Sequence, residues 1–311
     1  MAKTSVLLPV YNGQQYLESA IQSVLSQDAD FELLVQDDCS SDGTAEIARS
    51  FADPRVKYAV NPRNSGCWAS LQAAADRAGG QLLRLFSHDD LMLAGDLGQA
   101  EKCLAENPDY GVTISDYEKV DSHGAEIGSS FDHKQLHTEL PDRIRGSEAA
   151  WYLFRFGCIS GTQSTITVRR TLFDAVGGFD TAMRFCGDFA FLAKSAPAGG
   201  LVYNRRIAAK IRFHPQQTSK DGRKHMAYLD EMREVLRRLL LQMDPGRQAA
   251  AARAFKWIYG HQLFDLAVKN LLKLDGKFLK RFHEEYGGRM LGGSALAWAC
   301  KLPSRALRRA Q

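Results

Sequence analysis

The sequence has no run of apolar residues long enough to cross a membrane and no closely paired cysteines. A membrane-spanning helix needs about 20 consecutive apolar residues, whereas the longest candidate, LGGSALAWACKL near the C-terminus, is twelve residues long. The six cysteines contain no C-x-x-C pair, which argues against a zinc ribbon or a disulfide framework and favours a reducing compartment. The opening MAKTSVLLPVYNG lacks the apolar stretch of a signal peptide. These absences predict a cytoplasmic protein.

Charge is unevenly distributed along the chain. From Arg247 to Gln311 there are 13 Lys and Arg against 4 Asp and Glu, whereas the rest has 27 and 32. A basic tail on a mildly acidic body indicates a compositional boundary. Because its pattern is helical, the tail is expected either to pack as an amphipathic cap or to contact an anionic membrane surface. Nucleic acid binding is not expected, since the body is acidic and carries no nucleic-acid motif.

Strands and helices alternate through the first 90 residues. Apolar runs predict buried strands at residues 5–10, 31–38 and 81–86, and residues 14–27 have apolar side chains at helical spacing. Strands separated by helices of about 10–15 residues predict an α/β fold with a largely parallel sheet. Ligands of such sheets bind beyond the carboxyl ends of the strands.

Three of these predicted strands end on polar residues, namely the pairs Tyr11-Asn12, Asp37-Asp38 and Asp89-Asp90. Parallel strands place their carboxyl ends at one edge of a sheet, so the three pairs are expected to converge. Gathered carboxylates repel one another and need partners. A divalent metal shared with phosphate oxygens is one solution, and hydrogen bonds to a ribose or a base edge are another. The structural alternative is that some of these aspartates only cap the helices that follow.

Neither of the usual glycine-rich phosphate-binding loops is present. No G-x-G-x-x-G follows the first strand, and G-x-x-x-x-G-K-[ST] occurs nowhere. A site without such a loop needs a metal to neutralise a diphosphate, and aspartates could hold it. The residues therefore predict a metal-dependent enzyme that acts on a nucleoside diphosphate compound.

Four segments resemble, in order and spacing, the family 2 glycosyltransferases with the GT-A fold. They are SVLLPVYNGQQYLESAIQSVLSQ, FELLVQDDCSSDGT, NSGCWASLQAA and LFSHDDLML, and weaker similarity continues through VRRTLFDAVGGFD, CGDFAFLAKSA and IRFHPQQTS. The resemblance implies a mixed, mainly parallel sheet flanked by helices over residues 1–219. Its expected parts are a nucleotide-binding half at 1–95 and an acceptor and catalytic half at 96–219. A helical extension is expected at 220–311.

The resemblance also implies roles in the nucleotide-binding half. Tyr11 lies where an aromatic side chain packs on the nucleotide base, with a plain surface aromatic as the alternative. Asp38 matches the carboxylate that hydrogen-bonds the base, and Asp37 is its neighbour. Asn64 belongs to the donor-binding loop, and Asp89 is expected to contact the ribose. The expected donor is a nucleoside diphosphate sugar, with UDP as the nucleotide.

A metal site is implied by the acidic motif after the third of these strands. Asp89 and Asp90 match the family residues that hold ribose and metal, and His214 matches a histidine that completes the metal shell in some relatives. The expected ion is Mn²⁺ or Mg²⁺. The usual motif is D-x-D-D, whereas this chain has Ser87 in place of the first acid. Fewer carboxylate ligands predict a weaker metal affinity.

The catalytic base implied by the resemblance is Asp188. In the family this residue usually follows a glutamate, whereas here it follows Gly187. Its expected task is to take the proton of the acceptor hydroxyl as that oxygen attacks the anomeric carbon. The alternative is that Asp188 only caps a helix.

These expectations describe an inverting enzyme that adds a single sugar to a glycan or lipid-linked acceptor in bacterial surface polysaccharide synthesis. It would work in the cytoplasm or at the inner face of the cell membrane. Two alternatives remain open. A sugar-phosphate nucleotidyltransferase normally has a glycine-rich loop after its first strand, which this chain lacks. A non-catalytic nucleotide-sugar-binding protein on a decayed transferase fold is kept open by Ser87 and Gly187.

Overall fold

The computed structural model describes residues 3–130, 138–215, 217 and 226–251. The chain divides into two compact units, Met1–Thr218 and Ser219–Gln311. Helix α10 (Met226–Leu241) belongs to the second unit. The basic helices predicted beyond residue 251, and with them the predicted membrane contact, lie outside the described residues. Within the described ranges, no helix has the length and apolar character that a membrane span requires.

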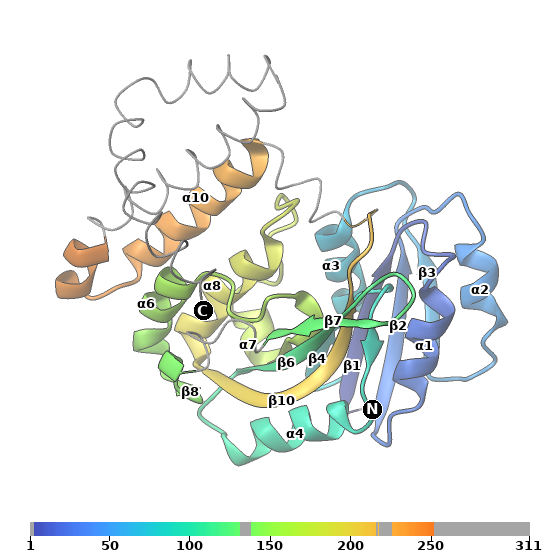
Figure 1. The fold of residues 1–311 in the computed structure, drawn as a ribbon, viewed down its shortest axis with the longest axis horizontal. Helices are drawn as coiled ribbons and strands as arrows, with labels where there is room; N and C mark the ends of the chain where they lie inside the picture. Colours follow the sequence, from blue (N-terminus) through green and yellow to red (C-terminus); the bar gives the residue numbers. More distant parts are fainter. Residues whose placement is uncertain (1–2, 131–137, 216, 218–225, 252–311) are drawn as a thin grey trace, which may run out of the picture. The chain divides into compact units, whose positions relative to one another are not determined.

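A mixed sheet forms the centre of the first unit (Figure 1). Its strands are β1 (Thr4–Val10), β2 (Phe31–Asp37), β3 (Val56–Val60), β4 (Leu82–Leu85), β5 (Leu91–Met92), β6 (Val112–Val120), β7 (Glu126–Ser129), β8 (Arg143–Ile144), β9 (Thr167–Arg169) and β10 (Leu201–Arg212). The order is β3-β2-β1-β4-β9-β6-β10-β5, with β7 paired to β6 and β8 to β10. Strands β1 to β4 pair in parallel, whereas β9 runs antiparallel between β4 and β6.

Helices cover both faces of this sheet. They are α1 (Leu17–Leu25), α2 (Thr44–Ser50), α3 (Cys67–Arg77), α4 (Asp96–Glu106), α6 (Gly146–Phe156), α7 (Arg170–Ala175) and α8 (Gly187–Gly199), with a short 3₁₀ helix η2 (Gln163–Thr165). In Figure 1, α1 and α2 lie on one side of β1 and β2, and α3 lies on the other. Because both faces are covered, every residue of β1 and β2 is buried.

The last strand is longer than the sequence pattern indicates. An apolar run predicts a strand from Ile207, but β10 begins at Leu201 and pairs in parallel with β6 along its whole length. The register shifts between Asn204 and Ile207. Such a bulge breaks the alternation of inward and outward side chains, and Arg205, which lies within it, is half-exposed. Because the bulge interrupts the alternation, the sequence pattern does not predict the first half of the strand.

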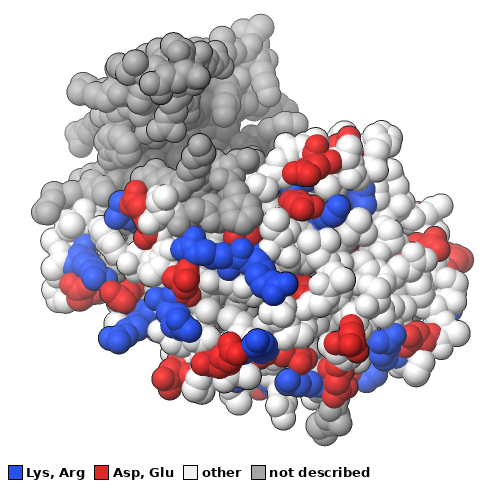
Figure 2. Space-filling view, turned by 60° about the horizontal axis from the view of Figure 1, so that its bottom comes forward, with Lys and Arg blue, Asp and Glu red and all other residues white. Residues whose placement is uncertain are grey.

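Surface charges contribute little to the stability of this unit. Figure 2 shows Lys and Arg side chains intermixed with Asp and Glu over one face of the molecule. Ion pairs of the described chain include Arg205 with Asp142 at 2.5 Å and Lys210 with Glu118 at 3.6 Å. Exposed pairs of this kind each stabilise a fold by roughly 0–1 kcal/mol. The buried core and the buried ion pair between Arg84 and Asp96 therefore contribute more to the stability of this unit.

The buried ion pair joins β4 to the start of α4. The Arg84 guanidinium donates to Asp96 Oδ2 at 2.5 Å, and the two side chains are 0% and 4% exposed. Arg84 also donates to Thr167 Oγ1 on β9 at 3.2 Å. Burial raises the pKa of Asp96, although the Arg84 charge acts in the opposite direction. Each charge thus depends on the other for its compensation inside the protein.

Replacing Asp96 by alanine is expected to destabilise the first unit strongly. The substitution leaves the Arg84 charge buried without its carboxylate, which costs about 3–5 kcal/mol in comparable cases. Urea unfolding monitored by circular dichroism measures the change. Asp174→Ala is the control, because it removes a carboxylate from an exposed helical pair with Arg170 and should cost about 0.5 kcal/mol or less. Equal losses in the two variants would show that the buried pair has no special role.

Candidate active site

The polar ends of β1, β2 and β4 meet at one edge of the sheet. The Asp38 amide donates to the carbonyl of Val10 at 2.8 Å, which joins the ends of β2 and β1. Gly13 lies directly against the His88 ring, since a β-carbon on this glycine would come within 2.7 Å of the ring. The loop after β1 therefore contacts the loop after β4. The convergence expected from parallel strands is observed.

Asp37 and Tyr11 have contrasting environments at this edge. Asp37 is 1% exposed, and its carboxylate accepts hydrogen bonds from the Tyr58 hydroxyl at 2.6 Å and the Ser40 amide at 2.8 Å. Both contacts stay within the protein. Tyr11, in contrast, is 47% exposed, so its ring is available to a ligand. Asp37 therefore supports the turn after β2, whereas the exposed ring of Tyr11 is a surface that a ligand could contact.

Asp38 fixes the loop that precedes α3. Its Oδ1 accepts from Asn61 Nδ2 and from the Ser65 amide, both at 2.8 Å, and its Oδ2 accepts from the Gly66 amide at 2.7 Å. The side chain is buried, whereas Asn64, which lies inside this loop, is exposed. Asp38 thus shapes the loop on which Asn64 lies, and any contact with a base adds to these three hydrogen bonds.

Asp89 and His214, the two residues implied by the resemblance as metal ligands together with Asp90, form a close pair. His214 Nε2 lies 2.9 Å from Asp89 Oδ2, and the two side chains are only 8% and 14% exposed. Burial tends to raise the pKa of Asp89, but the hydrogen bond from His214 and the nearby His88 and His214 charges lower it overall. The His214 ring also lies 5.1 Å from the ring of Tyr16. Asp89 is therefore held as a carboxylate beside an imidazole.

The carboxylate of Asp90 has different partners from the carboxylate of Asp89. Its Oδ2 accepts a hydrogen bond from Ser164 Oγ at 2.6 Å, and its Oδ1 accepts one from the Arg212 amide at 3.0 Å. Burial and the Asp89 charge raise the pKa of Asp90, and these two hydrogen bonds act against the rise. The side chain joins the loop after β4 to η2 and to the end of β10. The sequence predicts Asp90 as a metal ligand, and in the structure both of its carboxylate oxygens already accept hydrogen bonds from protein groups.

The donor set at this edge fits a metal site with two protein ligands. Among the described residues, no group of three or more His, Cys, Asp and Glu side chains could hold a metal ion together. A site built from the Asp89 carboxylate and the His214 imidazole would need its other ligands from phosphate oxygens and water. Mg²⁺ commonly binds with one or two carboxylates plus substrate phosphates. The two residues are compatible with such an ion.

Ser87, where the family has an acid, belongs to a polar bridge to η2. Its Oγ accepts a hydrogen bond from Gln163 Nε2 at 2.7 Å, and its amide donates to Ser164 Oγ at 3.0 Å. Gln163 Oε1 also accepts a weak hydrogen bond from the Cys67 thiol at 3.7 Å. Sequence reasoning missed Gln163 and Ser164, because their positions next to β4 depend on η2 folding back from 76 residues away.

Arg212 is a second residue that sequence reasoning missed. Only 6% exposed, it donates from Nε to the carbonyl of Asp89 at 3.0 Å and from Nη1 to the carbonyl of Ser122 at 3.2 Å. Its guanidinium lies 4.6 Å from the centre of the Tyr16 ring. A buried cation is thus placed beside the acidic loop. The available signal was a single arginine in an apolar strand, two residues before the candidate ligand His214.

Asp188 lies in the first turn of α8 and is half-buried. Burial raises the pKa of Asp188, while hydrogen bonds from the Phe189 amide and the Cys158 thiol act in the opposite direction. The raised pKa brings the carboxylate closer to the range in which a general base works at neutral pH. Asp188 is therefore a candidate for a functional group.

The start of α3 connects the segments that carry the acidic residues. The Gly66 amide donates to Asp38 Oδ2 at 2.7 Å, and the Trp68 ring lies against Gly187, next to Asp188. The Cys67 thiol donates to Gln163 Oε1 at 3.7 Å, and the Gln163 amide group donates to Ser87, two residues before Asp89. The segments that carry Asp38, Asp89 and Asp188 therefore meet around the start of α3.

Trp68 explains why a glycine precedes Asp188. A β-carbon on Gly187 would lie 2.0 Å from the Trp68 indole, so the ring fills the space that a side chain would need. Trp68 is 6% exposed and packs against Phe179, with ring centres 5.6 Å apart. The indole on α3 thus presses on the backbone next to the candidate base. A glutamate at position 187 would therefore not fit beside Trp68 as the two segments pack here.

Comparison with solved structures identifies the fold. The structure of S. aureus TarS 1–349 in complex with UDP-GlcNAc matches with a TM-score of 0.67 and 18% identity, covering 95% of this chain and 81% of TarS 1–349. TarS 1–349 in complex with UDP matches with a TM-score of 0.64 and 19% identity, covering 97% and 82%. At this level of identity the similarity concerns the fold alone, which is the GT-A fold predicted from the sequence.

Comparison with protein families identifies the family. The family model described as "Glycosyl transferase family 2" matches residues 5–156. The succinoglycan biosynthesis protein ExoO of Rhizobium meliloti is 28% identical over 229 residues, which are 73% of this chain and 64% of ExoO. A β-1,3-glucosyltransferase of Campylobacter jejuni that acts on GalNAc(5)-diNAcBac-PP-undecaprenol is 37% identical over 101 residues, 31% of this chain and 33% of that enzyme. Residues 5–156 therefore belong to glycosyl transferase family 2.

The chain matches only part of each of these relatives. An uncharacterised glycosyltransferase of Rickettsia prowazekii, for example, is 26% identical over 221 residues, which are 69% of this chain and 65% of that protein. The matched part of related Rickettsia proteins falls to 30% of their length. Family membership therefore rests on the shared domain.

The effects of substitutions at Trp68 and Gly187 on the free energy of unfolding are expected to be strongly coupled. Gly187→Ala alone should cost about 1–3 kcal/mol through overpacking, and Trp68→Ala alone about 3–5 kcal/mol. The double variant should cost less than the sum, since the new methyl group enters the space that the indole vacates. Urea unfolding of all four proteins measures this coupling. Gly98→Ala is the control, because nothing lies within 4 Å of that position. Additive losses would contradict the packing argument.

Proposed function

We propose that the protein transfers a single sugar from a nucleoside diphosphate sugar to a hydroxyl of a glycan or lipid-linked acceptor, with inversion at the anomeric carbon. The observation that carries the proposal is that the segments bearing Asp38, Asp89 and Asp188 all contact the start of α3 or the residues bonded to it, at the carboxyl edge of the sheet. The TarS complex with UDP-GlcNAc supports a UDP-sugar as the donor. The names of the R. meliloti and C. jejuni relatives support polysaccharide synthesis and a polyprenyl-linked acceptor.

The donor nucleotide would bind at the ends of β1 and β2. The exposed ring of Tyr11 packs on the base, and Asp38 accepts a hydrogen bond from the base edge. Asp37 contributes by holding the turn after β2 through Tyr58 and Ser40. Asn64, on the loop that Asp38 fixes, faces the same edge of the sheet as part of the donor site. Asp89 accepts a hydrogen bond from the ribose.

Asp89 and His214 would hold a Mn²⁺ or Mg²⁺ ion, with Asp90 supporting their loop from behind. When bound, such an ion supplies positive charge that stabilises a departing diphosphate. The chain's own contribution is to fix its two ligands: the Arg212 guanidinium holds the Asp89 carbonyl, and the Tyr16 ring packs on His214. The short protein ligand set predicts that the affinity for the ion depends on bound UDP.

Asp188 would act as the general base. As the acceptor oxygen forms a bond to the anomeric carbon, the bond from that carbon to the diphosphate breaks, and the bonding electron pair leaves with the nucleoside diphosphate. The proton of the acceptor hydroxyl passes to the Asp188 carboxylate. Attack from the face opposite the leaving group inverts the configuration. In-line positioning of the reactants lowers the barrier further.

Asp188→Asn is expected to lower kcat by about 10²–10⁴ while leaving the Kd for the donor unchanged, as is typical for loss of a general base. Because burial raises the Asp188 pKa, kcat of the wild type should fall with decreasing pH at a higher pH than for an ordinary aspartate. UDP release from UDP-GlcNAc with a glycan acceptor, and calorimetry with UDP, measure the two effects. Asp109→Asn removes an exposed carboxylate as a control. Near-normal turnover of Asp188→Asn would overturn the assignment.

The same variant has an expected effect on stability. A carboxyl group with a raised pKa in the folded state stabilises the protein fully below its unfolded pKa, and this contribution is lost as pH rises through the folded pKa. At neutral pH, Asp188→Asn should therefore be as stable as the wild type or more stable, and any gain should disappear near pH 4. Thermal unfolding across this range measures the difference.

Mn²⁺ binding should depend on His214 and on UDP. His214→Gln is expected to weaken Mn²⁺ binding to the UDP complex by about tenfold or more, since one of two protein ligands is lost. Ser87→Asp should strengthen it by restoring a nearby carboxylate. Electron paramagnetic resonance of free Mn²⁺ measures both without relying on turnover. His123→Gln is the control, because this histidine is exposed. Unchanged Mn²⁺ binding in His214→Gln would contradict the proposed site.

A further inference from the structure

Two loops at the carboxyl edge of the sheet are bonded to each other as well as to their own strands. They are the β1 loop (residues 11–14) and the β2 loop (residues 38–44). Asn12 Oδ1 accepts a hydrogen bond from the Ser41 amide at 2.9 Å, and the Asn12 amide donates to Ser40 Oγ at 2.9 Å. Asn12 therefore binds the neighbouring loop through both its side chain and its backbone.

Gln14 repeats this arrangement two residues further along the β1 loop. Its amide donates to Asp42 Oδ2 at 3.1 Å, and its side-chain Oε1 accepts a hydrogen bond from the Gly43 amide at 3.0 Å. Between these contacts, the Gly13 amide donates to Thr44 Oγ1 at 2.9 Å. Three consecutive residues of the β1 loop are therefore bonded to the β2 loop by their amides, and two of them also by their side chains.

Asp42 is held within the β2 loop by the residue that starts α2. Its Oδ1 accepts hydrogen bonds from the Thr44 amide at 3.1 Å and from the Thr44 hydroxyl. Burial tends to raise the pKa of Asp42, but the hydrogen bonds from Thr44 and from the Gln14 amide lower it overall. Asp42 is therefore a carboxylate at neutral pH, with one oxygen bonded to each loop.

Each of the two loops contains one residue with a left-handed backbone. Asn12 has a φ of 49° and Cys39 a φ of 65°, and within the described ranges they are the only residues other than glycine with a positive φ. Most side chains are strained in this conformation, although asparagine tolerates it comparatively well. Such strain persists where surrounding bonds enforce it, and it is concentrated at functional sites. Here Asn12 directly follows Tyr11, and Cys39 directly follows Asp38.

The bonds between the loops determine where the Tyr11 ring lies. Tyr11 is 47% exposed, so the place of its ring depends mainly on its backbone. On one side of Tyr11, the carbonyl of Val10 accepts a hydrogen bond from the Asp38 amide at 2.8 Å. On the other side, Asn12 is bonded to the β2 loop. Tyr11 is therefore fixed at both ends to the segment that carries Asp38.

We propose that Asn12 is a positioning residue of the nucleotide site, which holds the Tyr11 ring at a fixed place relative to Asp38 by binding the β2 loop. Gln14 acts in the same way at the other end of the β1 loop. The inference rests on the proposed function, in which Tyr11 packs on the base and Asp38 bonds the base edge. A site that is formed before its ligand arrives binds more tightly, because less ordering is needed on binding.

Three substitutions at Asn12 separate the effect of its side chain from that of its backbone. Asn12→Gly adopts a positive φ without strain but lacks the acceptor for the Ser41 amide. Calorimetry of the full chain with UDP should show a Kd raised about threefold to tenfold, which corresponds to the loss of one hydrogen bond. Asn12→Ala should raise the Kd further, because it also strains the backbone. Asn12→Asp keeps a side-chain acceptor and should recover most of the loss seen in Asn12→Ala.

A double-variant cycle shows whether Asn12 acts through Tyr11. Tyr11→Ala alone should weaken UDP binding, since the surface that packs on the base is lost. Adding Asn12→Gly to Tyr11→Ala should then weaken binding much less than Asn12→Gly does in the wild type, because the ring that Asn12 positions is already absent. A purely structural role would lower the affinity equally in both backgrounds.

Gln14 offers a second test with a matched control. Gln14→Ala removes the acceptor for the Gly43 amide and should also weaken UDP binding. Gln22→Ala removes another exposed glutamine, which donates a hydrogen bond to Glu18 within α1, and it should leave the Kd for UDP unchanged. Equal Kd values for these two variants would contradict the role of Gln14.

The outcomes distinguish failure of this inference from failure of the proposed function. If Tyr11→Ala weakens UDP binding but Asn12→Gly and Asn12→Ala do not, the base site is in the proposed place and the role of Asn12 is overturned. Equal losses for Asn12→Gly in the two backgrounds overturn it as well. If UDP does not bind the wild type, or if Tyr11→Ala binds UDP as tightly as the wild type, the proposed nucleotide site itself is wrong, and the inference fails with it.

Discussion

The arrangement of the candidate active site depends on one buried carboxylate. Asp90 accepts hydrogen bonds from Ser164 Oγ and from the Arg212 amide, and so it ties together three segments that are distant in sequence. An unpaired carboxylate at this depth would be expensive, so the three segments have to meet. Their meeting places His214 beside Asp89 and the Gln163 amide group beside Ser87. The buried Arg84–Asp96 pair acts in a similar way, since it joins β4 to the start of α4.

Two adjacent acids have different tasks because their surroundings differ. Asp89 borders solvent and has an imidazole partner that lowers its pKa, whereas Asp90 is enclosed and has its pKa raised. One is suited to meet a ligand and the other to hold the loop. Surroundings also decide the tasks of Asp37 and Asp38, since both carboxylates accept hydrogen bonds from other groups of the protein. Carboxylates that look equivalent in a motif are therefore divided between supporting and contacting roles by their hydrogen-bond partners.

The two departures from the family motifs each have a local physical explanation. The Ser87 hydroxyl accepts a hydrogen bond from the Gln163 amide group. The Trp68 ring occupies the space that a side chain at Gly187 would need. Both contacts link the first 90 residues to later parts of the same unit. Each departure is thus accommodated by a side chain that is distant in sequence.

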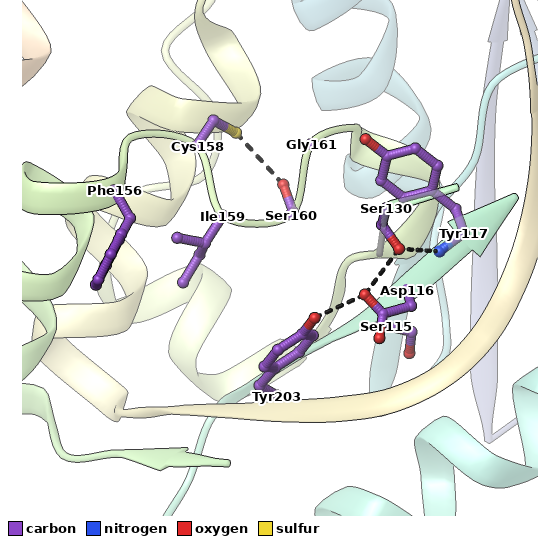
Figure 3. Close-up of a pocket in the computed structure, with 10 residues that line it drawn as sticks. All are labelled: Ser115, Asp116, Tyr117, Ser130, Phe156, Cys158, Ile159, Ser160, Gly161 and Tyr203. Atoms are coloured by element: carbon purple, nitrogen blue, oxygen red, sulfur yellow. Dashed lines mark hydrogen bonds between the residues drawn. The ribbon is translucent and has the colours of Figure 1, made fainter. Parts of the chain in front are cut away.

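The sequence by itself determined the fold class, the buried strands before each acidic pair and the family. These features depend on local alternation and on motifs that are contiguous in the chain. Only the tertiary structure decided which acids are enclosed and which remain near solvent, because burial and partners such as Ser164, Arg212 and His214 come from segments 74 to 125 residues away. The bulge in β10 and the η2 turn could not be predicted either, since neither follows a periodic pattern. The pocket lined by Asp116, Cys158 and Tyr203 (Figure 3) requires β6, β10 and the loop after α6 to be in place together, and no sequence pattern predicts that arrangement.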